Sequence, residues 1–248
     1  MASKFVKTAA MASICLLATT SLSFGGSTVS GTVSNKLKDG KKVTNTVRGN
    51  HNKASIATIT MDDSHVSGTV RNDIKKLRKT KNYVRGHGNK ASIAGINMER
   101  SNVSGRVTNR VTKHIKNSRN SVYGDRNTAV IGGIDMQNTR VSGEIYNRAK
   151  KIEKSRNYIR GNGNTALMGA VKTENARVSG GVLNLTDKIK KSKNLVRGDH
   201  NTAAMGAVVL KNSSVSGTVR NETKKLRNAT NDVNGDRNTV SISSVVIE

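Results

Sequence analysis

The stretch Val84-Arg85-Gly86-His87-Gly88-Asn89-Lys90-Ala91 decides the fold, because it returns along the whole chain. A close copy is Ile159-Arg160-Gly161-Asn162-Gly163-Asn164-Thr165-Ala166, and looser copies begin at Val47, Val122, Val196 and Val233. A second element, Val66-Ser67-Gly68-Thr69-Val70-Arg71-Asn72, alternates with the first. Its equivalents begin 37 or 38 residues apart, at Val29, Val66, Val103, Val141, Val178 and Val215.

A period this regular is typical of stacked repeats, in which each unit buries its apolar face only against its neighbours. We expect a domain over residues 26–248 with six units: 29–65, 66–102, 103–140, 141–177, 178–214 and 215–248. The third unit carries one extra residue between Asn109 and Asn120, inside a basic connector. This position predicts that the connector is a loop.

Composition favours a narrow structure over an ordinary core. Of 248 residues, 2% are aromatic, and the chain has no proline and no tryptophan. Large apolar side chains normally fill a core. Disordered chains lack β-branched residues, whereas here Val, Ile and Thr recur in register.

Alternation predicts strands. In Val66–Ile74, one face carries Val66, Gly68, Val70, Asn72 and Ile74, which is the period of two of a half-buried strand. The second half of the unit places Asn89, Ala91, Ile93 and Gly95 on one face, and Ala94, Ile96 and Met98 make its other face apolar as well. We therefore expect an all-β solenoid whose second strand is covered on both sides.

Each unit splits into two related halves, which open with Val-x-Gly and reach an Asn a few residues later. This similarity predicts two strand-turn-strand rungs per repeat and about twelve rungs in all. At about 4.8 Å per rung, the stack would be roughly 58 Å long.

Asparagine recurs in three columns. Stacked at about 4.8 Å, amide side chains can pass hydrogen bonds from rung to rung, which makes a polar interior tolerable. For the first column, which lies on the apolar face of a strand, we expect a ladder; the third suits a ladder and the left-handed turn positions that Asn tolerates equally well, so its role stays open. The columns are Asn35, Asn72, Asn109, Asn147, Asn184 and Asn221; Asn45, Asn82, Asn120, Asn157, Asn194 and Asn231; and Asn52, Asn89, Asn127, Asn164, Asn201 and Asn238.

A glycine column marks the position where the chain reverses. Glycine permits positive φ and close approach between rungs, which we expect here. A phosphate-binding glycine loop is disfavoured, because no copy opens a helix. The column is Gly49, Gly86, Gly124, Gly161, Gly198 and Gly235.

These motifs carry a resemblance. Gly86-His87-Gly88-Asn89-Lys90-Ala91 and Gly161-Asn162-Gly163-Asn164-Thr165-Ala166 resemble the Gly-x-Gly-Asn-x-Ala centre of the curlin repeat, the unit of secreted bacterial functional amyloids. The resemblance departs where curlin repeats carry flanking glutamines, since only Gln137 occurs in this chain. It implies a β-solenoid subunit that polymerises outside the cell.

Basic connectors are the other informative feature of a chain with a formal charge of +27. Such runs often form only a solvated face. Stacking would align them into a stripe whose like charges lie within a Debye length of about 8 Å, and a polyanion would relieve that repulsion. Extracellular DNA, acidic polysaccharide and lipopolysaccharide are the candidate partners, with DNA held through its phosphates. The predicted contacts are Lys75, Lys76, Arg78, Lys79, Lys150, Lys151, Lys190, Lys191, Lys224 and Lys225.

Catalytic, cofactor and metal sites are not expected. His51, His87 and His200 are single turn residues, and Asp125, Asp199 and Asp236 supply too few carboxylates for repeated calcium sites. We therefore expect neither an enzyme nor a small-molecule substrate.

The first residues differ from the repeats. Lys4 and Lys7 precede the uncharged run 9–26, which is typical of a secretory signal peptide over residues 1–25. Serine and threonine interrupt this run too often for a membrane span. The chain's single cysteine, Cys15, falls inside this segment, so cleavage would leave no thiol for a disulfide or a metal.

The sequence thus predicts an exported structural protein that forms fibres in an extracellular matrix or biofilm. Unguarded end rungs would template the next copy, because no proline blocks them. The alternative is a monomeric secreted adhesin that binds polyanions.

Overall fold

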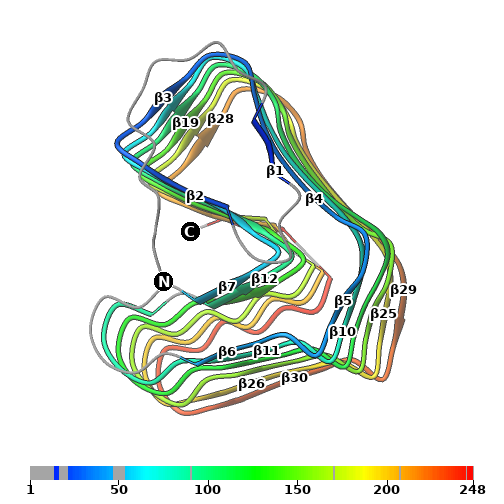
Figure 1. Ribbon diagram of the computed structural model, residues 1–248. Helices are drawn as coiled ribbons and strands as arrows, with labels where there is room; N and C mark the ends of the chain where they lie inside the picture. The colour runs from blue at the N-terminus through cyan, green and yellow to red at the C-terminus, as the bar shows by residue number, and fades with distance from the viewer. Residues whose placement is uncertain are drawn as a thin grey trace.

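The computed structural model describes residues 14–16, 22–46, 54–89, 91–169, 171–206, 208–243 and 245–247. These residues form strands and turns without a helix, and strands of successive units pair in parallel (Figure 1). The chain is therefore a β-solenoid.

Each stacking step spans a whole unit. Val70 pairs with Val107 and Asn72 pairs with Asn109, and equivalent partners recur along the stack. The prediction of two rungs per unit is wrong: one unit is one turn. Five steps separate the first unit from the sixth, so these units span about 24 Å along the axis, less than half the expected length.

The two halves of a unit resemble one another because they face each other across the interior, within one turn. Val70 from the first half and Ile96 from the second belong to one apolar cluster, and Leu77 and Ile93 share another.

Five parallel sheets run along the solenoid, and each is named here by its strand from the second unit. The β10 sheet contains β1 (Ile14–Leu16), β4 (Thr32–Leu37), β5 (Gly40–Lys41), β10 (Thr69–Arg78), β15 (Val107–Lys116), β20 (Ile145–Ala149), β21 (Ile152–Glu153), β25 (Val182–Lys190) and β29 (Val219–Arg227). The β11 sheet contains β6 (Thr44–Thr46), β11 (Lys81–Tyr83), β16 (Arg119–Ser121), β22 (Arg156–Tyr158), β26 (Lys193–Arg197) and β30 (Thr230–Asn234).

The remaining sheets come from the second half of each unit and the start of the next. The β12 sheet contains β7 (Ala54–Ile56), β12 (Ala91–Ile93) and β17 (Ala129–Ile131). The β13 sheet contains β2 (Leu22–Gly25), β8 (Ile59–Asp62), β13 (Ile96–Glu99), β18 (Ile134–Gln137), β23 (Val171–Glu174), β27 (Val208–Lys211) and β31 (Val245–Ile247). The β9 sheet contains β3 (Thr28–Val29), β9 (His65–Val66), β14 (Asn102–Val103), β19 (Arg140–Val141), β24 (Arg177–Val178) and β28 (Ser214–Val215).

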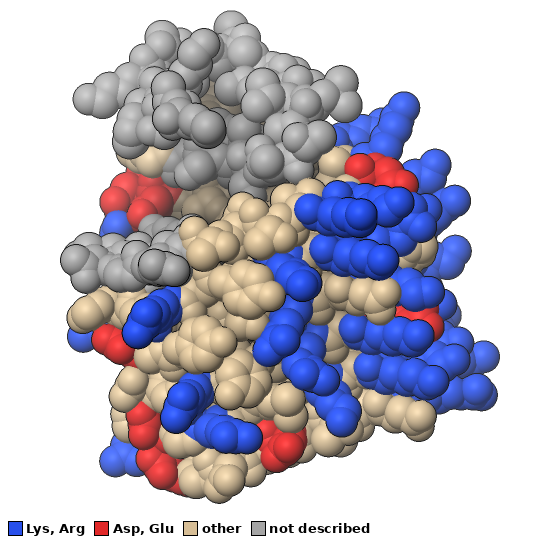
Figure 2. Space-filling view, turned by 60° about the horizontal axis from the view of Figure 1, so that its bottom comes forward, with Lys and Arg blue, Asp and Glu red and all other residues tan. Residues whose placement is uncertain are grey.

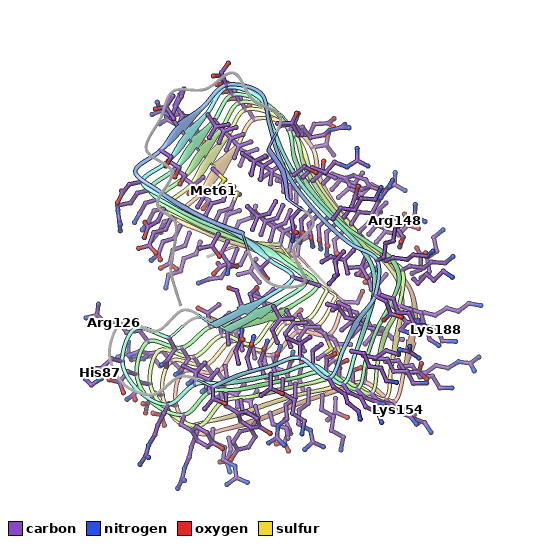
Figure 3. All side chains as sticks on the ribbon, viewed as in Figure 1. Met61, His87, Arg126, Arg148, Lys154 and Lys188 are labelled. Atoms are coloured by element: carbon purple, nitrogen blue, oxygen red, sulfur yellow. The ribbon has the colours of Figure 1, made fainter. Side chains whose placement is uncertain are left out.

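Seen along the axis, each turn is bent into two arms (Figure 1). One arm lies between the β10 and β13 sheets and closes at the β9 sheet. The other lies between the β11 and β12 sheets and closes at the glycine turns. Narrow arms need little bulk, which explains how a chain with few aromatic residues buries an interior. Figure 3 shows Met61 pointing into the first arm, whereas Arg148, Lys154 and Lys188 point outward.

The β12 sheet, formed by the apolar strand of the second half, is buried on both sides, but not by the residues that the sequence suggested. Ala94 has φ 59°, which turns the chain, so Ile96 and Met98 point inward from the β13 sheet rather than covering a second face. The outward side of the β12 sheet is nevertheless buried: Ser92 and Val130 are only 1% and 2% exposed. The predicted two-sided burial is therefore correct for this strand, with different residues on its outer side.

The asparagine columns form ladders, of which the second runs from Asn82 to Asn231 because Asn45 donates to the carbonyl of Ser55 instead. In the first column, Asn72 Nδ2 donates to Asn109 Oδ1 at 3.0 Å, and four equivalent bonds extend from Asn35 to Asn221. In the second column, Asn120 Nδ2 donates to Asn157 Oδ1 at 3.1 Å and to a backbone carbonyl. Most of these side chains are fully buried, so the ladder satisfies amides that water cannot reach.

The third column, whose role the sequence left open, is also a ladder. Asn164 Nδ2 donates to Asn127 Oδ1 at 2.7 Å, and Asn201 Nδ2 donates to Asn164 Oδ1 at 2.6 Å. Its amides donate toward the preceding unit, opposite in direction to the first two columns. Asn52 lies outside the described residues.

The turn glycines need a correction. Gly198 and Gly235 have positive φ as expected, but Gly86, Gly124 and Gly161 do not; Gly49 lies outside the described residues. The following residue carries the left-handed conformation at each turn: His87, Asp125, Asn162, Asp199 and Asp236, with φ between 58° and 79°.

Close approach between turns requires glycine elsewhere, in the Val-Ser-Gly elements. A Cβ on Gly180 would stand 2.6 Å from the carbonyl oxygen of Gly143, and a Cβ on Gly143 would be equally crowded by Gly105. Glycine is therefore required in the β9–β10 bends, where successive backbones lie almost in contact.

The connectors are not loops, contrary to the prediction. Lys75, Lys76 and Arg78 lie within β10 itself. The extra residue of the third unit is absorbed as an irregularity in the β10–β15 pairing, between Ile74 and Lys76. A bulge accommodates one more residue without breaking the sheet, which is why an insertion did not mark a loop here.

The predicted signal peptide falls largely outside the described residues and stays a prediction. Within it, β1 pairs with β4 and β2 pairs with β8.

Candidate polyanion-binding surface

The corner between the β10 and β11 sheets gathers cationic side chains into columns. Strand register places Arg78 between Lys41 and Lys116, and Lys190 between Glu153 and Arg227. Five of these six positions in one column are therefore cationic. Figure 2 shows the Lys and Arg side chains massed along this edge.

In each unit, the residue after this column lies at the corner between the β10 and β11 sheets and adopts the left-handed conformation. Two of the predicted contacts, Lys79 and Lys191, occupy it with φ of 56° and 51°. Both residues are exposed, and Figure 3 shows Lys154 of the same column pointing outward. The column is Lys42, Lys79, Asn117, Lys154, Lys191 and Asn228.

A third column precedes the corner. Lys76 pairs with His114 and Lys188 pairs with Lys225, while Lys151 lies between these pairs in the same register. Lys75, Lys150 and Lys224 are exposed one residue earlier. All ten predicted contacts therefore lie along this one edge of the solenoid.

Few acids neutralise the edge. Glu153 lies inside the first column, where Lys151 Nζ contacts its carboxylate at 2.8 Å. The hydrogen bond from Lys151, followed by the charges of Lys116 and Lys190, lowers the pKa of Glu153 although burial opposes the shift. Asp39 Oδ2 lies 3.6 Å from Lys76 Nζ and 3.5 Å from Arg78 Nη2.

The pKa of His114 reports the positive field of the edge. Burial is the largest cause of its lowering, and the charges of Lys76, Arg78, Lys151 and Lys116 add to it. A polyanion would meet a field that already disfavours one more positive charge.

Sequence reasoning missed a second basic region on the outer face of the β11 sheet. Lys81 pairs with Arg119, Arg119 with Arg156, and Arg156 with Lys193. Two positions further along these strands is a column that contains Tyr83 and Tyr158. The repeated pattern Lys-x-Tyr-x-Arg at 81–85 and Arg-x-Tyr-x-Arg at 156–160 was the available signal.

In the part of the chain that the structure describes, no three His, Cys, Asp or Glu side chains gather to hold a metal ion. The same residues contain no helix long and apolar enough to cross a membrane. The chain matches no protein-family model, no curated protein sequence and no solved structure.

Proposed function

We propose that this protein is a secreted structural subunit that assembles end to end into fibres of an extracellular matrix or biofilm, with a basic edge that binds polyanions. The observation that carries the proposal is the apolar surface exposed on the last described turn. Val240, Ile242 and Val245 are 54%, 41% and 40% exposed, whereas their equivalents one turn earlier are fully buried. Apolar interior and strand edges left open in this way favour pairing with another chain.

The first turn offers the complementary surface once residues 1–25 are removed. Within the described residues, β4 pairs with β1 and β8 pairs with β2, and both covering strands fall in the predicted signal peptide. In a second copy stacked at the same 37-residue step, Val219 would meet Val33 and Asn221 would meet Asn35. Glu222 would meet Lys36, which brings opposite charges into register.

The resemblance to curlin repeats supports the same mode of assembly. The six copies of the Gly-turn motif stack in register where the structure describes them, so identical residues repeat at every turn of a fibre as they do within one subunit. Such in-register stacking stabilises cross-β assemblies.

The test uses the chain that begins at residue 26. We expect it to form fibres visible by electron microscopy and to increase thioflavin fluorescence, and Val240→Lys/Ile242→Lys/Val245→Lys to stay monomeric, because three charges would be buried unpaired at the junction. Ser67→Lys/Ser104→Lys/Ser142→Lys adds the same charge to exposed side positions and should still assemble.

A wild-type chain that remains monomeric at high concentration would instead favour the second candidate, a monomeric secreted polyanion-binding adhesin. The observation in its favour is the basic edge, because all ten of its predicted contacts lie within one subunit and need no second copy.

Polyanion binding is tested separately. We expect retention on heparin and DNA columns that is lost in high salt, as for contacts made through charge. Lys75→Gln/Lys76→Gln/Arg78→Gln/Lys79→Gln should elute at lower salt. Unchanged elution would remove the basic edge from the proposal.

A further inference from the structure

We propose that the outer face of the β11 sheet binds single-stranded nucleic acid along the solenoid axis, with bases on its tyrosines and phosphates on its flanking cations. This inference names the polyanion and therefore rests on the proposed function. It concerns a different surface from the basic edge.

Tyrosine is concentrated on this face. The chain has four tyrosines, and three of them, Tyr83, Tyr123 and Tyr158, project from the outer side of the β11 sheet. Tyr123 is 39% exposed, and its ring lies 6.1 Å from that of Tyr158 with the two planes 69° apart. The rings of Tyr123 and Tyr158 therefore form a small aromatic platform, and Tyr83 lies in the same column as Tyr158, two units earlier.

Two cationic rows flank the column that contains Tyr83 and Tyr158. Positions alternate along a strand, so each row lies about 7 Å from that column. Cations of the first row recur about every 4.8 Å, whereas Tyr123 stands between Arg85 and Arg160 in the second row. The first row is Lys81, Arg119, Arg156 and Lys193, and the second contains Arg85, Arg160 and Arg197. Among the described residues of these three columns, Asp232 is the single acid, and it lies in the last unit.

The kind of cation distinguishes this face from the basic edge. Five of its seven cations are arginines, whereas nine of the ten predicted edge contacts are lysines. Arginine binds phosphate in a planar, bidentate way and also stacks on rings, while lysine acts as a point charge. Arg119 already lies 5.7 Å from the ring centre of Tyr158, in a cation–π contact.

Single-stranded nucleic acid exposes both its phosphates and the faces of its bases. Its binding proteins hold the phosphates with cations and stack the bases on aromatic side chains. A duplex hides its bases, so it would use the cations alone. An acidic polysaccharide has no aromatic faces to stack. The three columns run through the stacked units, so the site has the length of a few nucleotides in one subunit and continues across a fibre.

The experiment measures the anisotropy of fluorescein-labelled oligothymidine, a labelled duplex of mixed sequence, and labelled heparin. We expect Tyr83→Ala/Tyr123→Ala/Tyr158→Ala to weaken oligothymidine binding about tenfold or more, because each stacked base contributes about 1–3 kcal/mol. Duplex and heparin affinities should change less than about twofold, since every cation is retained.

The matched control keeps the rings. Tyr83→Phe/Tyr123→Phe/Tyr158→Phe should bind oligothymidine like the wild type, with circular dichroism confirming that each variant folds. The chain has no tryptophan, so tyrosine emission is its intrinsic fluorescence, and three of the four emitters lie on this face. We expect oligothymidine, but not heparin, to quench that emission in the wild type.

Two results would overturn the inference. Oligothymidine binding that survives the alanine variant, without quenching in the wild type, would show that the rings contact no bases. If the alanine variant loses heparin binding as much as oligothymidine binding, the face binds a sugar polymer rather than bases. The glutamine variant of the basic edge (Lys75→Gln/Lys76→Gln/Arg78→Gln/Lys79→Gln) tests whether the two surfaces are independent. They are independent if it loses heparin and duplex binding but still binds oligothymidine. If this variant alone loses binding of all three ligands, the tyrosine face is rejected as a site.

Discussion

The third and sixth units follow the same pattern, but in the part of the chain that the structure describes, the third lies between two neighbouring units and the sixth has a neighbour on one side. Ile115 is fully buried, whereas Leu226, at the equivalent position, is half-buried. Val122 is buried, and its counterpart Val233 is also half-buried. In this solenoid burial depends on the neighbouring turn as much as on the residue, so the open end carries the same interior without its cover.

The largest effect should come from deleting apolar bulk at matched positions. Ile115→Ala should lower the free energy of unfolding by about 3 kcal/mol, because a buried side chain leaves a cavity. Leu226→Ala should cost about 1 kcal/mol, since its site is partly open to water. Urea unfolding of the monomer gives both values, and equal losses would contradict the comparison. In assembled fibres we expect the difference to shrink, because the next copy would cover Leu226.

The asparagine ladder should give the second largest contrast. Asn120 accepts from Asn82 and donates to Asn157 and to the carbonyl of Val130, so Asn120→Ala leaves buried partners unsatisfied and should cost about 2–3 kcal/mol.

Asn231 is the control for that change. It accepts from Asn194 and donates to the carbonyl of Ser241, and the described structure places no further unit above it. Asn231→Ala should cost about 1 kcal/mol by the same urea measurement. A larger loss at Asn231 than at Asn120 would argue against a ladder that is strongest inside the stack.

A smaller effect on stability should come from Glu153, the acid in the cationic column of the basic edge. Glu153 lies between Lys116 and Lys190, and the pKa of its carboxyl is lowered, mainly by the hydrogen bond from Lys151. Its stabilisation is therefore present above the unfolded pKa of about 4.3 and is lost as pH falls through the lower folded value. Glu153→Gln should be less stable at pH 7 and lose less stability on acidification.

Arg227, at the open end of this column, provides the comparison. Arg227→Gln should leave the acid dependence unchanged, because arginine does not titrate in that range. Unfolding curves from pH 7 to pH 3 test both variants. An identical slope for Glu153→Gln and the wild type would contradict the role given to the carboxylate.

The smallest effect should come from His114. Its pKa is lowered, so the folded state favours the neutral ring. The contribution of the neutral His114 ring to the free energy of unfolding is present in full above the unfolded pKa of about 6.5. It declines as pH falls below that value, until the folded pKa is passed.

His114→Gln should remove that decline, whereas Lys225→Gln, in the same column of the last unit, should not. The comparison of unfolding free energies at pH 7.5 and pH 5.5 measures the difference. A decline that persists in His114→Gln would assign it to another group.

Much of this architecture was predictable from the sequence, because residues 37 apart stack on one another. The period revealed the units, the alternation of Val66 to Ile74 revealed the strands, and the asparagine columns revealed the ladders. The rung count was not predictable from the half-repeat, because two strands that face each other across a narrow interior need the same small side chains as two strands that stack.

The corners were hidden for a different reason. Left-handed positions are usually marked by glycine or asparagine. Here Lys79, Ala94 and Arg100 adopt positive φ because the turns above and below impose it. The basic edge was visible as charge runs, while the tyrosine face was marked only by the short patterns at 81–85 and 156–160, whose residues come together through strand register.

The hydrogen bonds between turns have a mechanical consequence. Those backbone bonds and the three asparagine ladders all point along the axis. A pull along a fibre would load the bonds of a whole turn simultaneously, so rupture would require many of them to fail together. A sideways force at the open end could peel β31 and its neighbours away in sequence. We therefore expect threads that resist tension and fray from one tip.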